Sequence, residues 1–215
     1  MIEKLYANKI ILVGVSHVSK KAKRDIETAI LSSENPKIAL ELCERRFYSL
    51  FSEKKNISVS SILKQGIFGI LISLVEKNIG KELNVMPGEE MKFAANLAKE
   101  MGLEIYLIDR DIGETLKRAK KISLREKIRM LSDFVFGYML GLGEDTINLE
   151  NIDDILQLLS KFKKRYPGLT EVLLRERDIY MAERIVEISK YGNVVAVVGA
   201  AHIKGIKEEL NNRFL

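Results

Sequence analysis

Two short apolar runs rich in β-branched residues constrain the fold of this 215-residue chain more than any other feature. They lie at residues 10–13 and 194–198, and each is followed by a Gly-x-x-His phrase, which ends at His17 and at His202. An apolar run bounded by glycine and followed by a helical pattern indicates a buried parallel strand that leads into a helix. Ligands of open α/β sheets bind beyond the carboxyl ends of such strands. The two histidines, the only ones in the chain, are therefore expected at one edge of a sheet.

Strand and helix patterns alternate along the rest of the chain. Strands are predicted at about 9–14, 37–42, 104–108 and 193–198, and helical patterns at 22–31 (with Ser19 as N-cap), 43–80, 87–102, 112–190 and a short stretch after His202. This order predicts parallel strands joined by helical crossovers. The expected fold class is α/β, with a small, mostly parallel sheet, flanking helices and a helical insertion that caps the C-terminal edge of the strands. The length fits a single domain, 1–215, with about 112–190 as a helical elaboration within it.

Composition favours a folded protein of a reducing compartment. Hydrophobic residues make up 47% of the chain and charged residues 30%, which is enough apolar material for a core. Cys43 is the single cysteine, so no internal disulfide forms, and we expect it to be a small buried side chain. The start of the chain lacks the pattern of a signal peptide. The longest apolar stretch, 67–75, falls short of the roughly 18 residues that a membrane span needs. A cytoplasmic location is expected.

The basic charge does not predict a nucleic-acid partner. The formal net charge is +5, from 35 Lys and Arg against 30 Asp and Glu. The basic residues are spread along amphipathic helices, as at 117–121 and 161–165, and no RNA-binding aromatic motif or zinc-finger spacing accompanies them. We interpret them as solvated helix faces.

Four candidate residues should emerge together at the carboxyl edge of the sheet: His17, Glu41, Asp109 and His202. Two imidazoles with one or two carboxylates are a common ligand set for a divalent transition metal. A site of two histidines and one carboxylate leaves a position open for water, which the metal acidifies. Other interpretations stay open: each histidine as an ordinary loop residue, and Asp109 as a helix cap.

Buried charge marks further candidates. Glu41 interrupts an apolar strand and therefore needs a cation, either a metal or one of the arginines Arg45 and Arg46 one helical turn on. Arg177 lies in an otherwise apolar helical stripe and has either an anion-binding role or a buried salt bridge, with Asp178 at the margin of that stripe. Glu89 suits the first turn of a helix or a ligand role.

Several phrases occur in the order of a known family. They are Val13-Gly14-Val15-Ser16-His17-Val18-Ser19, Glu41-Leu42-Cys43-Glu44-Arg45-Arg46, Gly88-Glu89-Glu90-Met91, Asp109-Arg110-Asp111, Arg177-Asp178-x-x-Met181-Ala182 and Val198-Gly199-Ala200-Ala201-His202-Ile203-x-Gly205-Ile206. With them the chain resembles the TraB/PrgY pheromone-shutdown family over essentially its whole length. That family is similar to the Tiki proteases and, more distantly, to ChaN and erythromycin-esterase-like proteins.

The resemblance implies a divalent-metal-dependent peptidase with manganese, cobalt or zinc as its cofactor. It places the metal at His17, Glu41 and His202, with Arg45 or Arg46, Glu89, Asp109 and Arg177 in support. Many members carry a membrane segment after this domain, and such a segment would make the full protein membrane-associated.

We expect hydrolysis of a small or extended peptide, with Glu41 as metal ligand or water-activating base, and with Arg177 or an arginine of the 45–46 pair stabilising the oxyanion. Two alternatives stay open: a peptide-binding or sequestering protein without turnover, and a metal-independent esterase-like hydrolase with a histidine base. The oligomeric state, including a homo-oligomer, also stays open.

Overall fold

The computed structural model of the chain describes residues 1–6, 9–15, 20–51, 88–139 and 160–214. It shows a mixed α/β protein with a five-stranded, mostly parallel sheet, which confirms the predicted fold class. The strands are β1 (Ile2–Leu5), β2 (Ile10–Val15), β3 (Lys37–Leu40), β4 (Ile105–Leu107) and β5 (Val194–Gly199). The α-helices are α1 (Lys20–Leu31), α2 (Glu44–Phe51), α5 (Glu89–Glu100), α6 (Ile112–Ala119), α7 (Leu124–Met139), α9 (Pro167–Thr170), α10 (Glu176–Ser189) and α11 (Ala200–Phe214), and η1 (Glu171–Arg175) is a π-helix.

The last strand in the sequence lies at the centre of the sheet, whose order is β1-β2-β5-β3-β4. The four predicted strands run parallel to one another. The sequence patterns do not predict β1, because it has four residues and two of them, Glu3 and Lys4, are charged. It pairs antiparallel with β2 and adds an edge strand to the predicted sheet.

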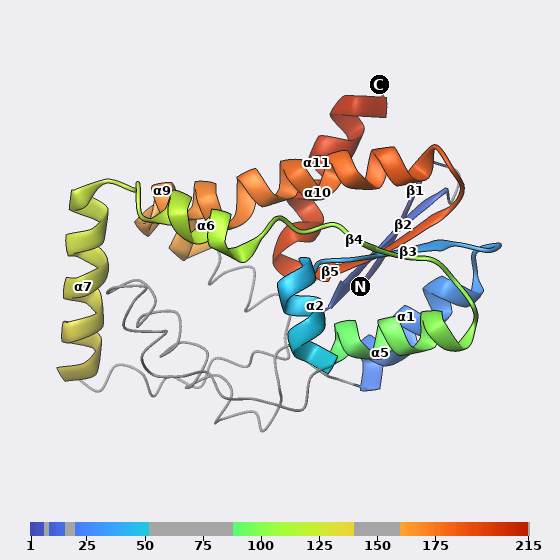
Figure 1. Ribbon diagram of the computed structural model, residues 1–215. Coiled ribbons are helices and arrows are strands. Elements are labelled where there is room, and N and C mark those ends of the chain that lie inside the picture. The colour runs from blue at the N-terminus through green and yellow to red at the C-terminus, as the bar shows by residue number, and fades with distance from the viewer. Residues whose placement is uncertain (7–8, 16–19, 52–87, 140–159, 215) are drawn as a thin grey trace.

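Helices cover both faces of the sheet, as the side chains of β5 show. Val195 and Val197 join a buried core with α1 and α5 on one face. Val194, Ala196 and Val198 pack against α10 and α11 on the other. The two pairs of helices lie on opposite sides of the strands in Figure 1. A strand buried on both faces explains the unbroken apolar run in the sequence.

The predicted helical segment 112–190 divides into two parts. Its last helix, α10, lies on the sheet, whereas α6, α7 and α9 surround a small core of their own. This third core consists of Ala119, Ile122, Met130, Leu169 and Val172. In Figure 1, α7 lies farthest from the strands. Residues 140–159, in the middle of the segment, are outside the described residues.

The final helix differs from its sequence prediction. The final helix is longer than predicted, with 15 residues, and it begins at Ala200, so that His202 lies in its first turn and not ahead of it. Ser19 and most of the predicted helical stretch 43–80, including the apolar residues 67–75, lie outside the described part. None of the described helices combines the length and the apolar character that a bilayer span requires.

Candidate functional site

Two acidic side chains leave neighbouring strands at the carboxyl edge of the sheet. Glu41 directly follows β3, and its backbone N–H donates to the Val197 carbonyl of β5 at 3.0 Å. Asp109 follows β4, and its N–H donates to the Leu42 carbonyl at 3.2 Å. These bonds continue the strand pairing past the strand ends, so both carboxylates are fixed at the predicted edge. Both residues are buried, at 8% exposure.

Arg177, the second residue of α10, binds both carboxylates with one guanidinium. Its Nε and Nη2 donate to the two carboxylate oxygens of Asp109 at 3.0 and 2.9 Å. Nη2 also donates to Oε1 of Glu41, and Nη1 donates to the Leu173 carbonyl at 3.1 Å. Arg177 therefore forms a buried salt bridge, which is one of the two interpretations left open. The partners in this salt bridge are two of the other candidate residues.

His202 lies between two carboxylates from different parts of the fold. Its Nδ1 is 2.6 Å from Oδ1 of Asp178 in α10, and its Nε2 is 3.3 Å from Oε1 of Glu41. The histidine is 4% exposed and Asp178 is 6% exposed. Since the Asp178 carboxylate accepts a hydrogen bond, Nδ1 carries a proton, and Nε2 is the nitrogen available toward Glu41.

The electrostatics of the cluster favour the charged forms of Glu41 and His202. Burial on its own would raise the pKa of Glu41, but His202, Arg177 and the Gly199 amide together bring that pKa well below its usual range. Burial would lower the pKa of His202, but Glu41 and the hydrogen bond to Asp178 outweigh it and raise the pKa to about 9. Burial raises the pKa of Asp178, and the bond to His202 offsets only part of that effect.

Two glycines leave room for these contacts. The Gly199 N–H donates to Oε2 of Glu41 at 2.6 Å, and a Cβ on Gly199 would lie 3.2 Å from the same oxygen. A Cβ on Gly205, one helical turn after His202, would lie 2.0 Å from Oδ2 of Asp178. The second distance is far below van der Waals contact, so α10 and α11 approach closely here only because residue 205 lacks a side chain.

The remaining sequence candidates lie at the rim or away from the cluster. Arg46 donates to Oδ2 of Asp109 at 3.4 Å, with a side chain that is 41% exposed. Arg45 is 71% exposed and lies 3.8 Å from Asp111, which caps α6 through the Gly113 amide. Glu89 is exposed in the first turn of α5, and none of the contacts described for the cluster involves it. His17 lies outside the described residues.

Comparison with known proteins now decides the family. A model of the TraB/PrgY/gumN family matches residues 1–213. The chain belongs to this family. The resemblance to TraB and PrgY proteins is thereby confirmed, and with it the expectation that it extends over nearly the whole chain.

Relatives in the TraB/PrgY/gumN family include archaeal and mammalian proteins. A protein of Methanocaldococcus jannaschii, described as uncharacterized, is 38% identical over an alignment of 211 positions, which covers 92% of this chain and 52% of the relative. The TraB domain-containing proteins of Bos taurus and Homo sapiens are 26% and 25% identical over alignments of 234 positions, gaps included, which cover 94% of this chain and 62% of each relative. The chain thus spans between about half and three fifths of the length of these relatives.

Sequence reasoning did not assign a role to Asp178, although the residue stands beside Arg177 in one of the family phrases. Its partner His202 is on another helix, 24 residues away, so no local spacing connects them. The signal that could have found the pair is Gly205, because a glycine one turn from a candidate histidine leaves space for a neighbouring group. In this family member, Asp178 is the residue that orients His202.

The donor atoms fit part of a metal site. Among the described residues, no three His, Cys, Asp or Glu side chains are grouped so that they could hold a metal ion. Two predicted ligands are nevertheless neighbours, with 3.3 Å between Oε1 of Glu41 and Nε2 of His202. Ligand bonds of about 2.0–2.2 Å to one ion place two donor atoms roughly 3 Å apart, so this pair suits a shared metal.

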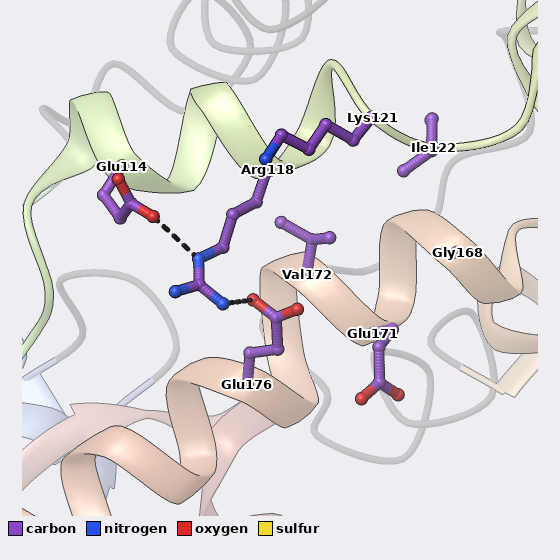
Figure 2. A pocket seen from close by; sticks show the side chains of 8 residues that line it. All are labelled: Glu114, Arg118, Lys121, Ile122, Gly168, Glu171, Val172 and Glu176. Atoms are coloured by element: carbon purple, nitrogen blue, oxygen red, sulfur yellow. Dashed lines mark hydrogen bonds and ion pairs between the residues drawn. The ribbon is translucent and has the colours of Figure 1, made fainter.

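A pocket of about 490 Å³ lies apart from the cluster, between α6 and the segment of α9, η1 and α10. Figure 2 shows Arg118 between Glu114 and Glu176 in its wall. The described residues that line it are Glu114, Arg118, Lys121, Ile122, Gly168, Glu171, Val172 and Glu176. They carry charges of both signs, and none of them is a histidine.

Proposed function

We propose that this chain is a divalent-metal-dependent hydrolase that cleaves peptide bonds, with His17, Glu41 and His202 as metal ligands. The observation that carries the proposal is the setting of His202. Its Nδ1 is held by Asp178 at 2.6 Å and its Nε2 faces Glu41 at 3.3 Å. A carboxylate on the far nitrogen of a metal-binding imidazole is the usual support for such a ligand.

The order of the strands supports His17 as the third ligand. β2, which leads to His17, ends at Val15, and Val15 is in register with Gly199 of β5. Nitrogen and oxygen ligands of this kind suit manganese, cobalt or zinc. When bound, the metal would lower the pKa of a water molecule and polarise the scissile carbonyl.

Asp178, Arg177 and Arg46 have supporting roles in the proposed site. Asp178 orients the His202 ring. Arg177 compensates the charges of Glu41 and Asp109, and four of its five N–H groups have acceptors among the described residues. The remaining Nη1 proton is the part of Arg177 that can donate to a developing oxyanion. Arg46, half-exposed beside Asp109, is the other cation at the rim.

A metal-independent hydrolase is the second candidate, because the His202–Asp178 pair also has the form of a general base with its orienting carboxylate. The pKa of His202, raised to about 9, does not separate the two candidates, because a general base and a metal ligand both need the neutral ring. Hydrolysis in the presence of a chelator separates them. The choice of peptides as substrates follows the resemblance to Tiki-type proteases.

The test uses protein stripped with a chelator and then titrated with Mn²⁺, Co²⁺ or Zn²⁺. We expect one ion to bind by calorimetry and a fluorogenic peptide library to be hydrolysed only by the loaded protein. His17→Ala, Glu41→Gln and His202→Ala should each abolish hydrolysis, with circular dichroism as the check on folding. Lys204→Ala is the matched control on α11, since Lys204 is exposed.

Two results would overturn the proposal. Full hydrolysis in excess chelator would establish the metal-independent hydrolase. Peptide affinity without metal binding or turnover would establish a sequestering protein instead. A cytoplasmic location is also part of the proposal, to be checked by fractionation of cells. The oligomeric state stays open, and light scattering measures it.

A further inference from the structure

Arg110 is buried beside the site but makes no contact with Glu41 or His202 among the described residues. It follows Asp109 in the chain and is 8% exposed. Its guanidinium reaches three acceptors from three elements. Nε donates to Oγ1 of Thr115 in α6 at 2.9 Å, Nη1 to Oε2 of Glu176 in α10 at 2.6 Å, and Nη2 to the Val172 carbonyl of η1 at 2.6 Å.

The acceptor in η1 is unusual because η1 is a π-helix of five residues inserted directly before α10. Such turns are rare and commonly lie at functional sites. Two neighbouring carbonyls of this turn accept from guanidinium groups: Val172 from Arg110 and Leu173 from Arg177. The π-turn thus connects one arginine outside the site to the arginine inside it.

A second connection runs parallel to the first. Asp109 and Arg110 leave β4 as an acid followed by a base, and Glu176 and Arg177 open α10 in the same order. Asp109 pairs with Arg177, and Arg110 pairs with Glu176. The two ion pairs cross-link the same two stretches of chain, one on the site side and one on the side of the pocket in Figure 2.

From these contacts we propose that Arg110 is a positioning residue: it fastens the π-turn and Glu176 so that the Arg177 guanidinium stays against Glu41 and Asp109. The inference rests on the proposed function for its catalytic consequence, though not for its structural one. Without Arg110, the turn can relax to α-helical spacing, and removing one residue from a helical turn rotates the residues on either side by about 100° relative to each other. Arg177 would then lose its alignment with both carboxylates.

The experiment separates the effect of the three hydrogen bonds of the Arg110 guanidinium from the effect of its positive charge. Arg110→Lys keeps a cation for Glu176, but an ammonium cannot bridge three separated acceptors as a guanidinium does. Arg118→Gln is the matched control, because Arg118 shares Glu176 at 3.3 Å but is 48% exposed and is not hydrogen-bonded to η1. The primary measurement is hydrogen exchange of the Arg177 Nε–H by NMR on ¹⁵N-labelled protein, which requires neither metal nor substrate.

In Arg110→Lys we expect the Arg177 Nε–H to exchange at least about tenfold faster, and hydrolysis of the best peptide to lose about 10–100-fold in kcat with little change in KM. Arg118→Gln should leave both unchanged. Unchanged Arg177 exchange in a folded Arg110→Lys variant overturns the positioning role. If Arg110→Lys does not fold, Glu176→Ala decides, since it removes the acceptor of the Arg110 Nη1 hydrogen bond, and unchanged exchange there overturns the role too. A wild-type protein without hydrolysis would refute the proposed function and leave the exchange result standing.

Discussion

Gly205 of α11 and Asp178 of α10 touch so closely that a methyl group cannot be placed between them. A Cβ on Gly205 would lie 2.0 Å from Oδ2 and 2.6 Å from Cγ of Asp178. Asp178 cannot simply move aside, because its other oxygen is bonded to His202. The orientation of a candidate metal ligand therefore depends on a glycine that makes no polar contact with it.

Gly205→Ala should destabilise the protein, against the trend of helix propensity. Alanine within a helix is favoured over glycine by about 1 kcal/mol. Forcing a methyl group into a packed contact typically costs about 1–3 kcal/mol, so a net loss is expected in urea unfolding. Lys204→Ala, at an exposed position of the same helix, should change stability by no more than about 0.5 kcal/mol. A Gly205→Ala protein more stable than wild type would contradict the close contact.

The pKa of His202 predicts how the stability of the metal-free protein depends on pH. Its folded pKa of about 9 lies above the ordinary value of 6.5, so the folded state holds the proton more tightly than the unfolded state. The resulting stabilisation is complete below about pH 6.5 and is lost as pH rises through 9. Its size is on the order of 3 kcal/mol for this buried group.

Urea unfolding at intervals from pH 6 to pH 9.5, in chelator, measures this effect. His202→Gln is the reference, because it keeps a polar side chain but cannot titrate. The difference in unfolding free energy between the two proteins should shrink steadily above pH 6.5. A difference that stays constant over the whole range would mean that His202 is not held protonated.

Metal binding should release a proton from His202, because the Nε2 lone pair serves either the proton or the metal. Between pH 6 and 8 the affinity should rise about tenfold per pH unit, since this range lies below the pKa of His202. Calorimetry in two buffers with different ionisation enthalpies counts the protons released. Affinity that does not vary with pH would exclude His202 as a ligand.

Asp178→Asn should weaken the metal site without removing a ligand. Loss of an orienting carboxylate typically lowers metal affinity by about 10–100-fold. Calorimetric titration of the metal-free variant with Zn²⁺ measures this affinity. Glu183→Gln is the control on the same helix. Its partner Arg213 lies at the opposite end of α11 from His202, and the ion pair between Glu183 and Arg213 is exposed. Equal affinities in the two variants would show that Asp178 does not support the site.

The residues at the carboxyl edge of the sheet could be predicted because their sequence signals are local. An unbroken apolar run marks a strand buried on both faces, and parallel strands bring their carboxyl ends to one edge. Glu41, Asp109 and His202 follow from this rule alone. The rule does not predict β1, because this edge strand contains the charged residues Glu3 and Lys4 and therefore has no apolar run.

Contacts between helices could not be predicted in the same way. Asp178 meets His202, and Arg110 meets Val172, only after α10 and α11 have packed and η1 has formed. The i to i+5 turn of η1 leaves no mark in the residue pattern that separates it from an ordinary helix. Adjacency in the sequence also failed to separate Arg45 from Arg46. Of these two arginines, Arg46 contacts Asp109, whereas Arg45 lies beside Asp111.

The central position of β5 has a consequence for synthesis of the protein. Its neighbours β2 and β3 are both made long before it, and they do not pair with each other in the sheet. Before residues 194–199 have left the ribosome, the parts β1–β2 and β3–β4 have no strand to join them. The charged cluster therefore cannot assemble until β5 and the start of α11 have been made.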